Sequence, residues 1–329
     1  MNLDGKRIIV SRTDSIGDVM LTLPICHWIK QQAPTAQIIF LGKGYTKPVV
    51  EAYAEVGQFE DWAEYSEKNS AAQLEWLKSL NADIFLHVFP NKELASLAKK
   101  AKISTRVGTS HRMYHLLTCT HRVNFTRKNS ELHESQLNFE LLRPLGLTEI
   151  PDLEAINQST EAFQPKPEGL PEPFQSLENF VVLHPKSQGS AREWPMEKYL
   201  ELAGRLVAFG KNVVFTGTEN EGQLFRNQLP ENDQILDSTG KLSLQQLITL
   251  IGKSKGLIAC STGPLHIAGY SGIRTVGLFS PQRPIHPGRW KALGPEVRIL
   301  VCPEGNSKDT NYNCLDEITV DSAFHALTS

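Results

Sequence analysis

Short apolar runs alternate with helical patterns along the whole chain, and this alternation restricts the fold more than any other feature. Runs such as residues 7–11 (RIIVS) and 180–184 (FVVLH) predict buried strands because they are short, apolar and rich in branched side chains. Strands that alternate with helices form parallel sheets covered by helices. We therefore expect an α/β chain with mainly parallel sheets.

The same patterns give bounds for the expected elements. Strands are expected at residues 7–11, 37–41, 84–88, 180–184, 212–215, 256–259 and 275–279. Helices are expected at residues 18–32, 133–145, 196–209, 243–252, 264–270 and 320–327. Pro24 is expected to kink or break the first of these helices, because proline lacks an amide hydrogen to donate.

A proline-rich stretch separates two sets of alternating elements. Residues 165, 167, 171 and 173 are all proline, which excludes a helix or a central strand there. We interpret residues 164–175 as a linker between an α/β domain at 1–163 and a second at 176–329. The length of 329 residues suits two domains.

Composition and charge exclude several classes of protein. The net charge of −2 argues against general nucleic-acid binding. The start of the chain lacks the apolar core of a signal peptide, and no run of about 18 apolar residues predicts a membrane span. Five scattered cysteines without a C-x-x-C pair suit reduced thiols, and Cys302 and Cys314 are expected to be free. We therefore expect a cytoplasmic protein.

The first strand is followed by a polar loop and the start of a helix, VSRTDSIGDVMLTLP. One interpretation is a capping box, with Ser15 as N-cap and Asp18 bonding back to it. The other makes Asp18 a catalytic carboxylate that takes a proton from an attacking hydroxyl group. Gly17 allows a tight turn or a close backbone approach. Arg12, Ser15 and Gly17 are expected to lie on the acceptor side of the site. The loop is not G-x-G-x-x-G, which argues against a dinucleotide-dependent dehydrogenase.

Two loops in the second half are rich in hydrogen-bond donors. The segment HPKSQGSAREWP carries Lys186, Ser187 and Arg192 and can hold a diphosphate, although it can also be an ordinary solvated loop. The segment ACSTGPLHIAGYSG leads from a strand into a helix whose free amides attract anions. Its candidate phosphate-binding residues are Ser261, Thr262, Gly263 and His266. Simple helix capping by Ser261 or Thr262, and a packed histidine, are the structural alternatives.

Taken together, these segments resemble the glycosyltransferase family that contains the ADP-heptose:lipopolysaccharide heptosyltransferases. The matching residues are RTDSIGDVMLTLP near the start, HP with WP at 184–195, DSTGKLSL at 237–244, STGPLH at 261–266 and CLDEITV near the end. The resemblance covers nearly the whole chain in order. It implies a GT-B fold, in which two Rossmann-like domains face each other and bind acceptor in the first domain and nucleotide sugar in the second.

The resemblance also implies an inverting transfer that needs no metal and no cofactor. By matched position Asp18 is the base, Arg192 contacts phosphate or donor sugar, and Thr262, Gly263 and His266 bind phosphate. Residues Thr216, Gly217 and Glu219 lie where the family binds the nucleoside. The implied donor is ADP-heptose and the implied acceptor is a lipopolysaccharide core, with no nucleic acid involved.

Two departures from the family pattern concern the donor side. In the family the segment that matches STGPLH normally begins with aspartate, and here Ser261 replaces it. Lys186 replaces the usual glycine after His184-Pro185. The heptose itself is therefore open. Three alternatives remain: the same chemistry with another nucleotide sugar, an epimerase acting on a nucleotide sugar, and a non-catalytic nucleotide-sugar-binding protein.

Charge is unevenly distributed in the first half. Residues 92–128 contain nine Lys and Arg against the single acid Glu93, a net charge of +8. Such a surface favours an anionic glycolipid or oligosaccharide acceptor, or peripheral contact with the inner membrane, although an ordinary solvated face has the same composition. The histidines at 111, 115 and 121 with Cys119 suggest a metal only weakly, because no acid lies near them.

Overall fold

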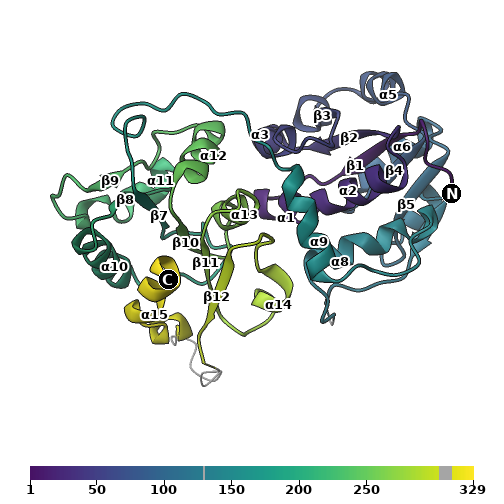
Figure 1. The fold of residues 1–329 in the computed structure, drawn as a ribbon. Helices are drawn as coiled ribbons and strands as arrows, with labels where there is room; N and C mark the ends of the chain where they lie inside the picture. The colour runs from purple at the N-terminus through teal and green to yellow at the C-terminus, as the bar shows by residue number, and fades with distance from the viewer. Residues whose placement is uncertain (129, 304–312) are drawn as a thin grey trace. The chain divides into compact units, whose positions relative to one another are not determined.

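The computed structural model describes residues 1–128, 130–303 and 313–329, and the chain divides into two compact units, Met1–Gln164 and Pro165–Ser329 (Figure 1). Among the described residues, each unit contains one six-stranded sheet. Every strand pairing recorded in the two sheets is parallel. The expected α/β class with parallel sheets is therefore confirmed.

The sheet of the first unit has the strand order β3-β2-β1-β4-β5-β6. Its strands are β1 (Arg7–Ser11), β2 (Gln37–Gly42), β3 (Gln58–Asp61), β4 (Ile84–His87), β5 (Thr105–Thr109) and β6 (His121–Val123). The α-helices of this unit are α1 (Ile16–Met20), α2 (Leu23–Gln32), α3 (Lys47–Glu51), α4 (Ala63–Ser66), α5 (Ser70–Ser79), α6 (Lys92–Lys100), α7 (His115–Thr118), α8 (Glu134–Phe139) and α9 (Leu153–Gln158). The sequence patterns missed β3, β5 and β6, which are short or carry polar side chains.

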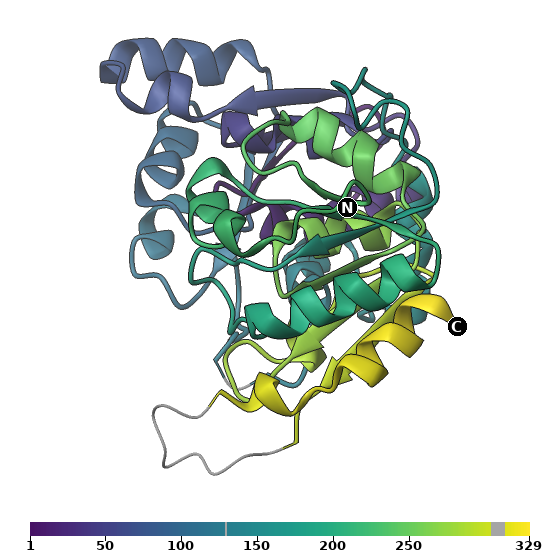
Figure 2. The same cartoon turned by 90° about the vertical axis from the view of Figure 1, so that its left-hand side faces the viewer.

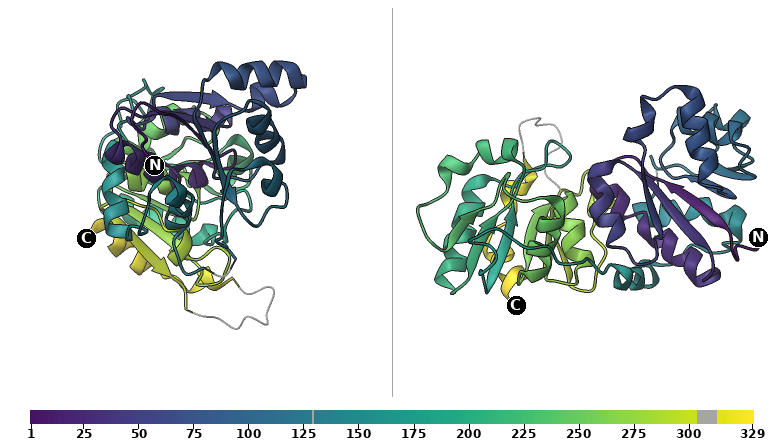
Figure 3. Two further views of the ribbon diagram at one scale, coloured as in Figure 1. Left: turned by 90° about the vertical axis from the view of Figure 1, so that its right-hand side faces the viewer. Right: turned by 90° about the horizontal axis from the view of Figure 1, so that it is seen from above.

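Helices cover both faces of this sheet (Figures 1 and 3). On one face, Ile9 and Phe85 of the central strands pack with Trp76 of α5 and Leu94 of α6 in a buried cluster. The helices α2 and α8 lie on the other face. Removing such side chains from water is the main favourable term in folding, so this packing fixes the sheet whose edge carries the first set of predicted site residues.

Proline shapes both helical segments of the first unit that were predicted as single helices. The segment 18–32 is divided into α1 and α2, and Pro24 lies in the first turn of α2, where a missing amide hydrogen costs nothing. The segment 133–145 begins at an N-cap formed by His133 and continues beyond α8 as a 3₁₀ helix, Glu140–Leu145. The predicted break is thus confirmed, and the second helix is tighter than expected in its final turns.

The sheet of the second unit has the strand order β12-β11-β10-β7-β8-β9. Its strands are β7 (Phe180–His184), β8 (Asn212–Phe215), β9 (Ile235–Asp237), β10 (Leu257–Cys260), β11 (Thr275–Phe279) and β12 (Val297–Val301). Its α-helices are α10 (Met196–Ala208), α11 (Glu219–Gln223), α12 (Leu244–Lys253), α13 (Gly263–Tyr270), α14 (Pro287–Trp290) and α15 (Val320–Thr328). Each element predicted in this half is found within one or two residues of its expected bounds.

The helices α10 and α15 run side by side against the second sheet (Figure 2). Trp194, just before α10, is buried and donates a hydrogen bond from Nε1 to the carbonyl oxygen of Ile318, 3.0 Å away. Tyr199 of α10 meets the Trp194 ring edge-on, with 4.9 Å between the ring centroids. These contacts explain the WP pair of the sequence motif as a packing feature that leads from the loop after β7 into the core.

Cys302 and Cys314 form a disulfide, which corrects the prediction that both are free thiols. Their Cα atoms lie 5.7 Å apart, within the usual range for a disulfide. The sequence offered no sign of this pairing, because the chain between them is long enough for its ends to meet or to stay apart. Cys26, Cys119 and Cys260 are free and buried, as expected for reduced thiols.

The proline-rich stretch forms neither helix nor strand from Gln164 to Pro171, in agreement with its composition. Hydrogen bonds join it to α12. The Glu168 amide donates to Thr249 Oγ1, and the side chains of Gln245, Gln246 and Lys253 donate to backbone carbonyl oxygens of the stretch. Among the described residues, every helix is too short or too polar to cross a bilayer.

Candidate active site

The loop after β1 carries the first set of predicted residues at the carboxyl edge of the first sheet, where ligands bind in open α/β sheets. Ser15 stands at the N-cap position of α1, but its hydroxyl group makes no capping bond and instead donates to Asp18 Oδ2. The capping-box interpretation is therefore wrong. Gly17 lies inside α1, so the tight turn, one of the two roles expected for it, is not formed.

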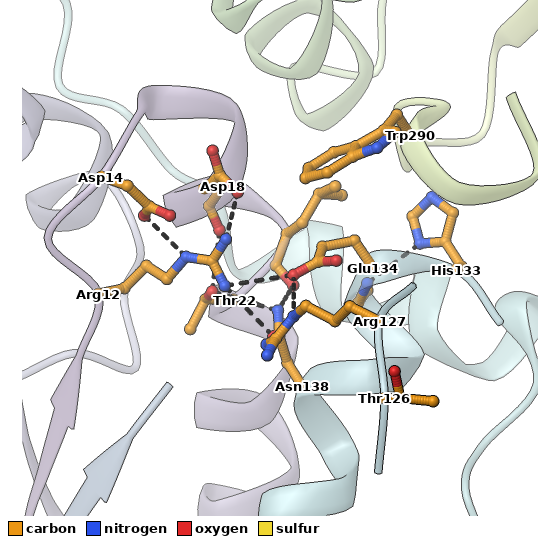
Figure 4. Close-up of polar contacts among 12 residues, drawn as sticks. Arg12, Asp14, Asp18, Thr22, Thr126, Arg127, His133, Glu134, Asn138 and Trp290 are labelled. Carbon is orange, nitrogen blue, oxygen red and sulfur yellow. Dashed lines mark hydrogen bonds and ion pairs between the residues drawn. The ribbon is translucent and has the colours of Figure 1, made fainter. Parts of the chain in front are cut away.

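A buried arginine holds this loop together (Figure 4). The Arg12 guanidinium donates from Nε to Asp14 Oδ1 over 2.7 Å and pairs with Asp18 Oδ1. Its Nη1 lies 3.3 Å from Glu134 Oε1 of α8. The side chains of Arg12 and Glu134 are 4% and 1% exposed, whereas that of Asp18 is 19% exposed. Asp18 is thus held by Arg12 at one oxygen and by Ser15 at the other, and it still reaches solvent.

A second arginine completes the network. Arg127 donates to Glu134 Oε1 over 2.9 Å and to Asn138 Oδ1 over 2.9 Å. The Asn138 amide in turn donates to the Leu21 carbonyl oxygen and to Thr22 Oγ1, which ties α8 to the end of α1 (Figure 4). The sequence gave no sign of Arg127, Glu134 or Asn138 as site residues, because they lie more than 100 positions from Arg12 and only the fold joins them.

Asp14 differs from Asp18 in its surroundings. Burial raises the pKa of Asp14 to about 6, and the Asp18 carboxylate adds to this shift while Arg12 opposes it. The Tyr45 hydroxyl group donates to the Asp14 carbonyl oxygen over 2.8 Å. Tyr45 and Phe89 follow β2 and β4 and expose their rings at the same edge of the sheet. This edge therefore combines two partly exposed carboxylates, Asp14 and Asp18, with aromatic rings that can stack on sugars.

The loop after β7 holds its own carboxylate. Glu193 accepts hydrogen bonds from Lys186 Nζ at 2.9 Å, from the Ser187 amide at 2.8 Å and from Ser187 Oγ at 2.9 Å. These bonds keep the pKa of Glu193 below its usual value, against the effect of its partial burial. Lys186 and Ser187, both predicted to bind the donor, thus hold the loop in shape in this structure.

Arg192 and Ser261 line a pocket of about 350 Å³ at the carboxyl edge of the second sheet. Its walls come from the loops that follow β7, β10 and β11. Arg192 Nη2 donates to Gln282 Oε1 over 2.8 Å, which positions the guanidinium on the pocket wall. The volume falls in the lower part of the range of about 300–1,000 Å³ for small-molecule sites.

The start of α13 retains unused hydrogen-bonding capacity. Thr262 is the N-cap residue, yet its side chain makes no capping bond, and its buried Oγ1 has no hydrogen-bond partner among the described residues. Gly263 opens the helix, and Pro264 follows in its first turn. His266 is buried on the same helix. A buried hydroxyl group is normally satisfied, so the free Thr262 hydroxyl suits a bound ligand better than simple capping.

The three predicted nucleoside residues follow β8, next to β7. Thr216 is buried, and its Oγ1 lies 3.0 Å from His184 Nδ1. Gly217 follows it, and Glu219 is held by two hydrogen bonds from Arg226, which also donates to Asp237 Oδ2. The DSTGK segment thus forms the wall beside this loop: a Cβ atom on Gly240 would lie 2.6 Å from a Glu219 carboxylate oxygen.

The histidines of the first unit do not converge on a metal site. His111 and His121 are exposed, while His115 is buried and its Nδ1 lies 2.8 Å from the Thr109 carbonyl oxygen. Within the described parts of the chain, no three His, Cys, Asp or Glu side chains are grouped so that they could hold a metal. His87 of β4 is buried against Phe85, and neither of its ring nitrogens has a hydrogen-bond partner there.

His87 should make stability depend on pH. Burial, with contributions from His115 and Arg106, lowers the pKa of His87 to about 3. Below pH 6.5 His87 therefore binds a proton in the unfolded chain but stays neutral in the folded chain. The free energy of unfolding falls as the pH falls. The limiting slope is about 1.4 kcal/mol per pH unit for one proton.

Urea unfolding between pH 5 and pH 7 measures this contribution. We expect His87→Phe to lose less stability over this interval than the wild type, because other titrating groups are common to both proteins. Equal pH slopes in the two proteins would show that His87 is protonated, or solvated, in the folded state.

Comparison with known proteins places this architecture in a family. The model of glycosyltransferase family 9 (heptosyltransferase) matches residues 74–319. A protein of Haemophilus influenzae whose name assigns it to the glycosyltransferases is 25% identical over 350 residues, covering 97% of this chain and 94% of the relative. Lipopolysaccharide heptosyltransferase 3 of Escherichia coli is 24% identical over 283 residues, covering 80% of each chain.

A solved structure supports the same assignment of the fold. The Escherichia coli heptosyltransferase WaaC with ADP superimposes with a TM-score of 0.74 at 17% identity, covering 97% of this chain and 98% of that chain. The fold is that of the GT-B glycosyltransferases. The chain belongs to glycosyltransferase family 9.

Proposed function

We propose that this protein transfers heptose from ADP-heptose, with inversion, to a lipopolysaccharide core acceptor on the cytoplasmic side of the inner membrane. The observation that carries the proposal is the Asp18 carboxylate, anchored by the buried Arg12 and still open to solvent at a ligand-binding edge. Membership of family 9 supports the reaction class. A relative named lipopolysaccharide heptosyltransferase 3 and a neighbour solved with ADP support the choice of acceptor and donor.

On this proposal the first unit binds the acceptor, and Asp18 acts as the base. The acceptor hydroxyl oxygen forms a bond to the anomeric carbon of the sugar while the bond from that carbon to the diphosphate oxygen breaks. The hydroxyl proton passes to Asp18, and ADP departs with the bonding electrons. A positioned base contributes about 10²–10⁴-fold in such a step. The contacts from Arg12 and Ser15 hold the carboxylate in one orientation, which limits the loss of entropy on binding.

The second unit binds the donor. Arg192 and the amides at the start of α13, with Gly263 and the free Thr262 hydroxyl, supply hydrogen bonds and positive charge to the diphosphate. Ser261 contributes to the pocket wall, and Lys186 and Ser187 hold the loop after β7 through Glu193. His266, buried in α13, binds the phosphate. Thr216, Gly217 and Glu219 contact the nucleoside. Because these protein groups supply the positive charge, transfer should persist in EDTA.

The departures at Ser261 and Lys186 define the second candidate, a family member that uses another nucleotide sugar. Ser261 lies on the pocket wall, where a carboxylate would contact sugar hydroxyl groups differently. Calorimetric titration with ADP, UDP and GDP, and with their sugar conjugates, separates the candidates. We expect ADP to bind best and ADP-heptose more tightly than ADP. Preference for UDP or GDP would discard heptose, and no binding of any nucleotide would indicate a non-catalytic protein.

Replacing Arg192 should weaken binding of ADP. A hydrogen bond to a charged group contributes about 1.5–3 kcal/mol, so we expect Arg192→Ala to raise the Kd for ADP by roughly 10- to 150-fold. Calorimetry measures this change directly. Arg205→Ala is the matched control, since Arg205 pairs with Asp321 on the surface of the same unit. Equal affinities of Arg192→Ala and the wild type would remove Arg192 from the donor site.

A further inference from the structure

A small group of exposed apolar side chains lies on the connection between β5 and β6. Met113, Leu116 and Leu117 are 84%, 54% and 75% exposed, although they lie within five residues of one another. Single exposed apolar side chains are ordinary, but apolar side chains that cluster at the surface mark contact sites. We call Met113, Leu116 and Leu117 the α7 patch.

The helix α7, which carries part of this patch, is fixed against the sheet by buried contacts. The patch residues are therefore exposed on an ordered element. His115 of α7 is buried, and its Nδ1 lies 2.8 Å from the Thr109 carbonyl oxygen at the end of β5. A Cβ atom on Gly108 would lie 2.6 Å from that same nitrogen and 2.9 Å from Cys119 Sγ. Gly108 thus lets α7 press against the sheet, and the residues after His115 are presented outward.

Positive charge surrounds the patch. Arg112 precedes Met113, and Arg122 Nη1 lies 3.3 Å from the Leu116 carbonyl oxygen; both arginines are exposed. The helix α6 contacts α7, and its last turn carries the exposed Lys99 and Lys100. From Leu94 to Lys128 the sequence has eight Lys and Arg and no Asp or Glu. An apolar centre with a cationic surround and no acid matches the interface of an anionic bilayer, where apolar groups enter and cations meet headgroups.

The position of the patch suits the proposed acceptor. The residues that lead into α7 follow β5, so they begin at the same carboxyl edge of the sheet as Arg12 and Asp18. The strand β5 is two places from β1 in the sheet, about 10 Å at the usual strand spacing. A bilayer that contacts the patch would thus lie beside the edge at which the proposed base is held.

We propose that the α7 patch inserts into the surface of an anionic phospholipid bilayer, while Arg112, Arg122 and the end of α6 bind the headgroups. Membrane binding goes beyond the transfer reaction. It rests on the proposed function in one respect, because its purpose would be to bring a lipid-anchored acceptor to Asp18. Each basic residue near an anionic surface adds to the electrostatic attraction. The three apolar side chains add the burial of their hydrocarbon surface.

Co-sedimentation with lipid vesicles tests the proposal without donor or acceptor, so its result is independent of the proposed transfer. We expect the full-length protein to bind vesicles of phosphatidylcholine with about 30% phosphatidylglycerol at least tenfold more tightly than vesicles of phosphatidylcholine alone. Salt at about 0.5 M should release the protein from the anionic vesicles, because salt screens exposed charges. Leu117→Asp should lower binding to the anionic vesicles at least tenfold. Leu224→Asp is the matched control, because Leu224 is 63% exposed in the other unit.

Three outcomes would overturn the proposal. The first is equal binding to the neutral and the anionic vesicles, or none to either. The second is undiminished binding by Leu117→Asp, with a folded state verified by circular dichroism. The third is a wild type that sediments as a dimer without binding vesicles while Leu117→Asp sediments as a monomer, which would assign the α7 patch to a second copy of this chain. Loss of vesicle binding by Arg112→Glu with Arg122→Glu would support the role of the cationic surround.

Discussion

Asp18→Asn is expected to lower kcat for sugar transfer by about 10²–10⁴-fold while the Kd for the donor stays within a few-fold of the wild type. The amide keeps the shape of the side chain and can still accept from Arg12, but it cannot take the hydroxyl proton. Single-turnover transfer measures the chemical step, and calorimetry measures the donor affinity separately.

Asp14→Asn is the matched comparison for Asp18→Asn. Asp14 lies in the same loop and pairs with the same arginine, but burial raises its pKa to about 6 and its carboxylate is held by Arg12 Nε. We expect a much smaller loss of kcat in Asp14→Asn. If Asp18→Asn turned over like the wild type, or if Asp14→Asn were the more damaged variant, Asp18 would not be the base.

Glu134→Gln is expected to destabilise the first unit by about 3–5 kcal/mol, the usual cost of breaking a buried ion pair from one side. The Glu134 side chain is 1% exposed and pairs with both Arg12 and Arg127. Its neutral replacement leaves the buried Arg12 and the partly buried Arg127 with less compensating charge, and it loosens the link between α8 and the Asp18 loop. Urea unfolding followed by tryptophan fluorescence measures this change. Trp28, Trp62 and Trp76 report on the first unit, and Trp194 and Trp290 report on the second.

The control for this variant is Glu140→Gln in the adjoining 3₁₀ turn. Glu140 pairs with Arg143, whose side chain is 41% exposed, and such surface pairs contribute about 0–1 kcal/mol. We therefore expect Glu140→Gln to unfold close to the wild type. Equal urea midpoints for Glu134→Gln and Glu140→Gln would mean that water replaces the missing charge and that the Arg12 network is not essential to the fold.

Most of the central strands could be predicted because local patterns of apolar residues indicate them. The strands 7–11, 180–184, 212–215 and 275–279 are found with their predicted bounds, because short branched apolar runs can be buried in parallel sheets and hardly elsewhere. The edge strands β3 and β6 were not predicted because they lack such an apolar run. Both are short and partly exposed, so polar side chains hide their period.

The site could be predicted only as far as its residues lie in motifs. Arg12, Asp18, Arg192 and Ser261 were marked by their loops, and the structure places each at the carboxyl edge of its own sheet. The partners that hold Asp18 could not be found this way. Glu134 and Asn138 reach Arg12 from a helix more than 100 residues away, and no local pattern records such a contact.

Two local interpretations failed because the side chains found other partners. Ser15 has the spacing of a capping residue. Its hydroxyl group donates to the Asp18 carboxylate and accepts no hydrogen bond from a helix amide. Cys302 and Cys314 have no pairing signal in their spacing, yet the fold brings their Cα atoms to 5.7 Å. For the cysteines the partner was set by the fold, and for Ser15 it was a side chain three residues along the chain.

The most direct test of the central claim is the anomeric configuration of the product. ADP-β-heptose is incubated with lipopolysaccharide core acceptors that lack their outer heptose, and the isolated product is examined by NMR. A single displacement with Asp18 as base predicts an α-linked heptose that appears with release of ADP and is lost in Asp18→Asn. A β-linked product, or undiminished formation of the linked product by Asp18→Asn, would contradict the account.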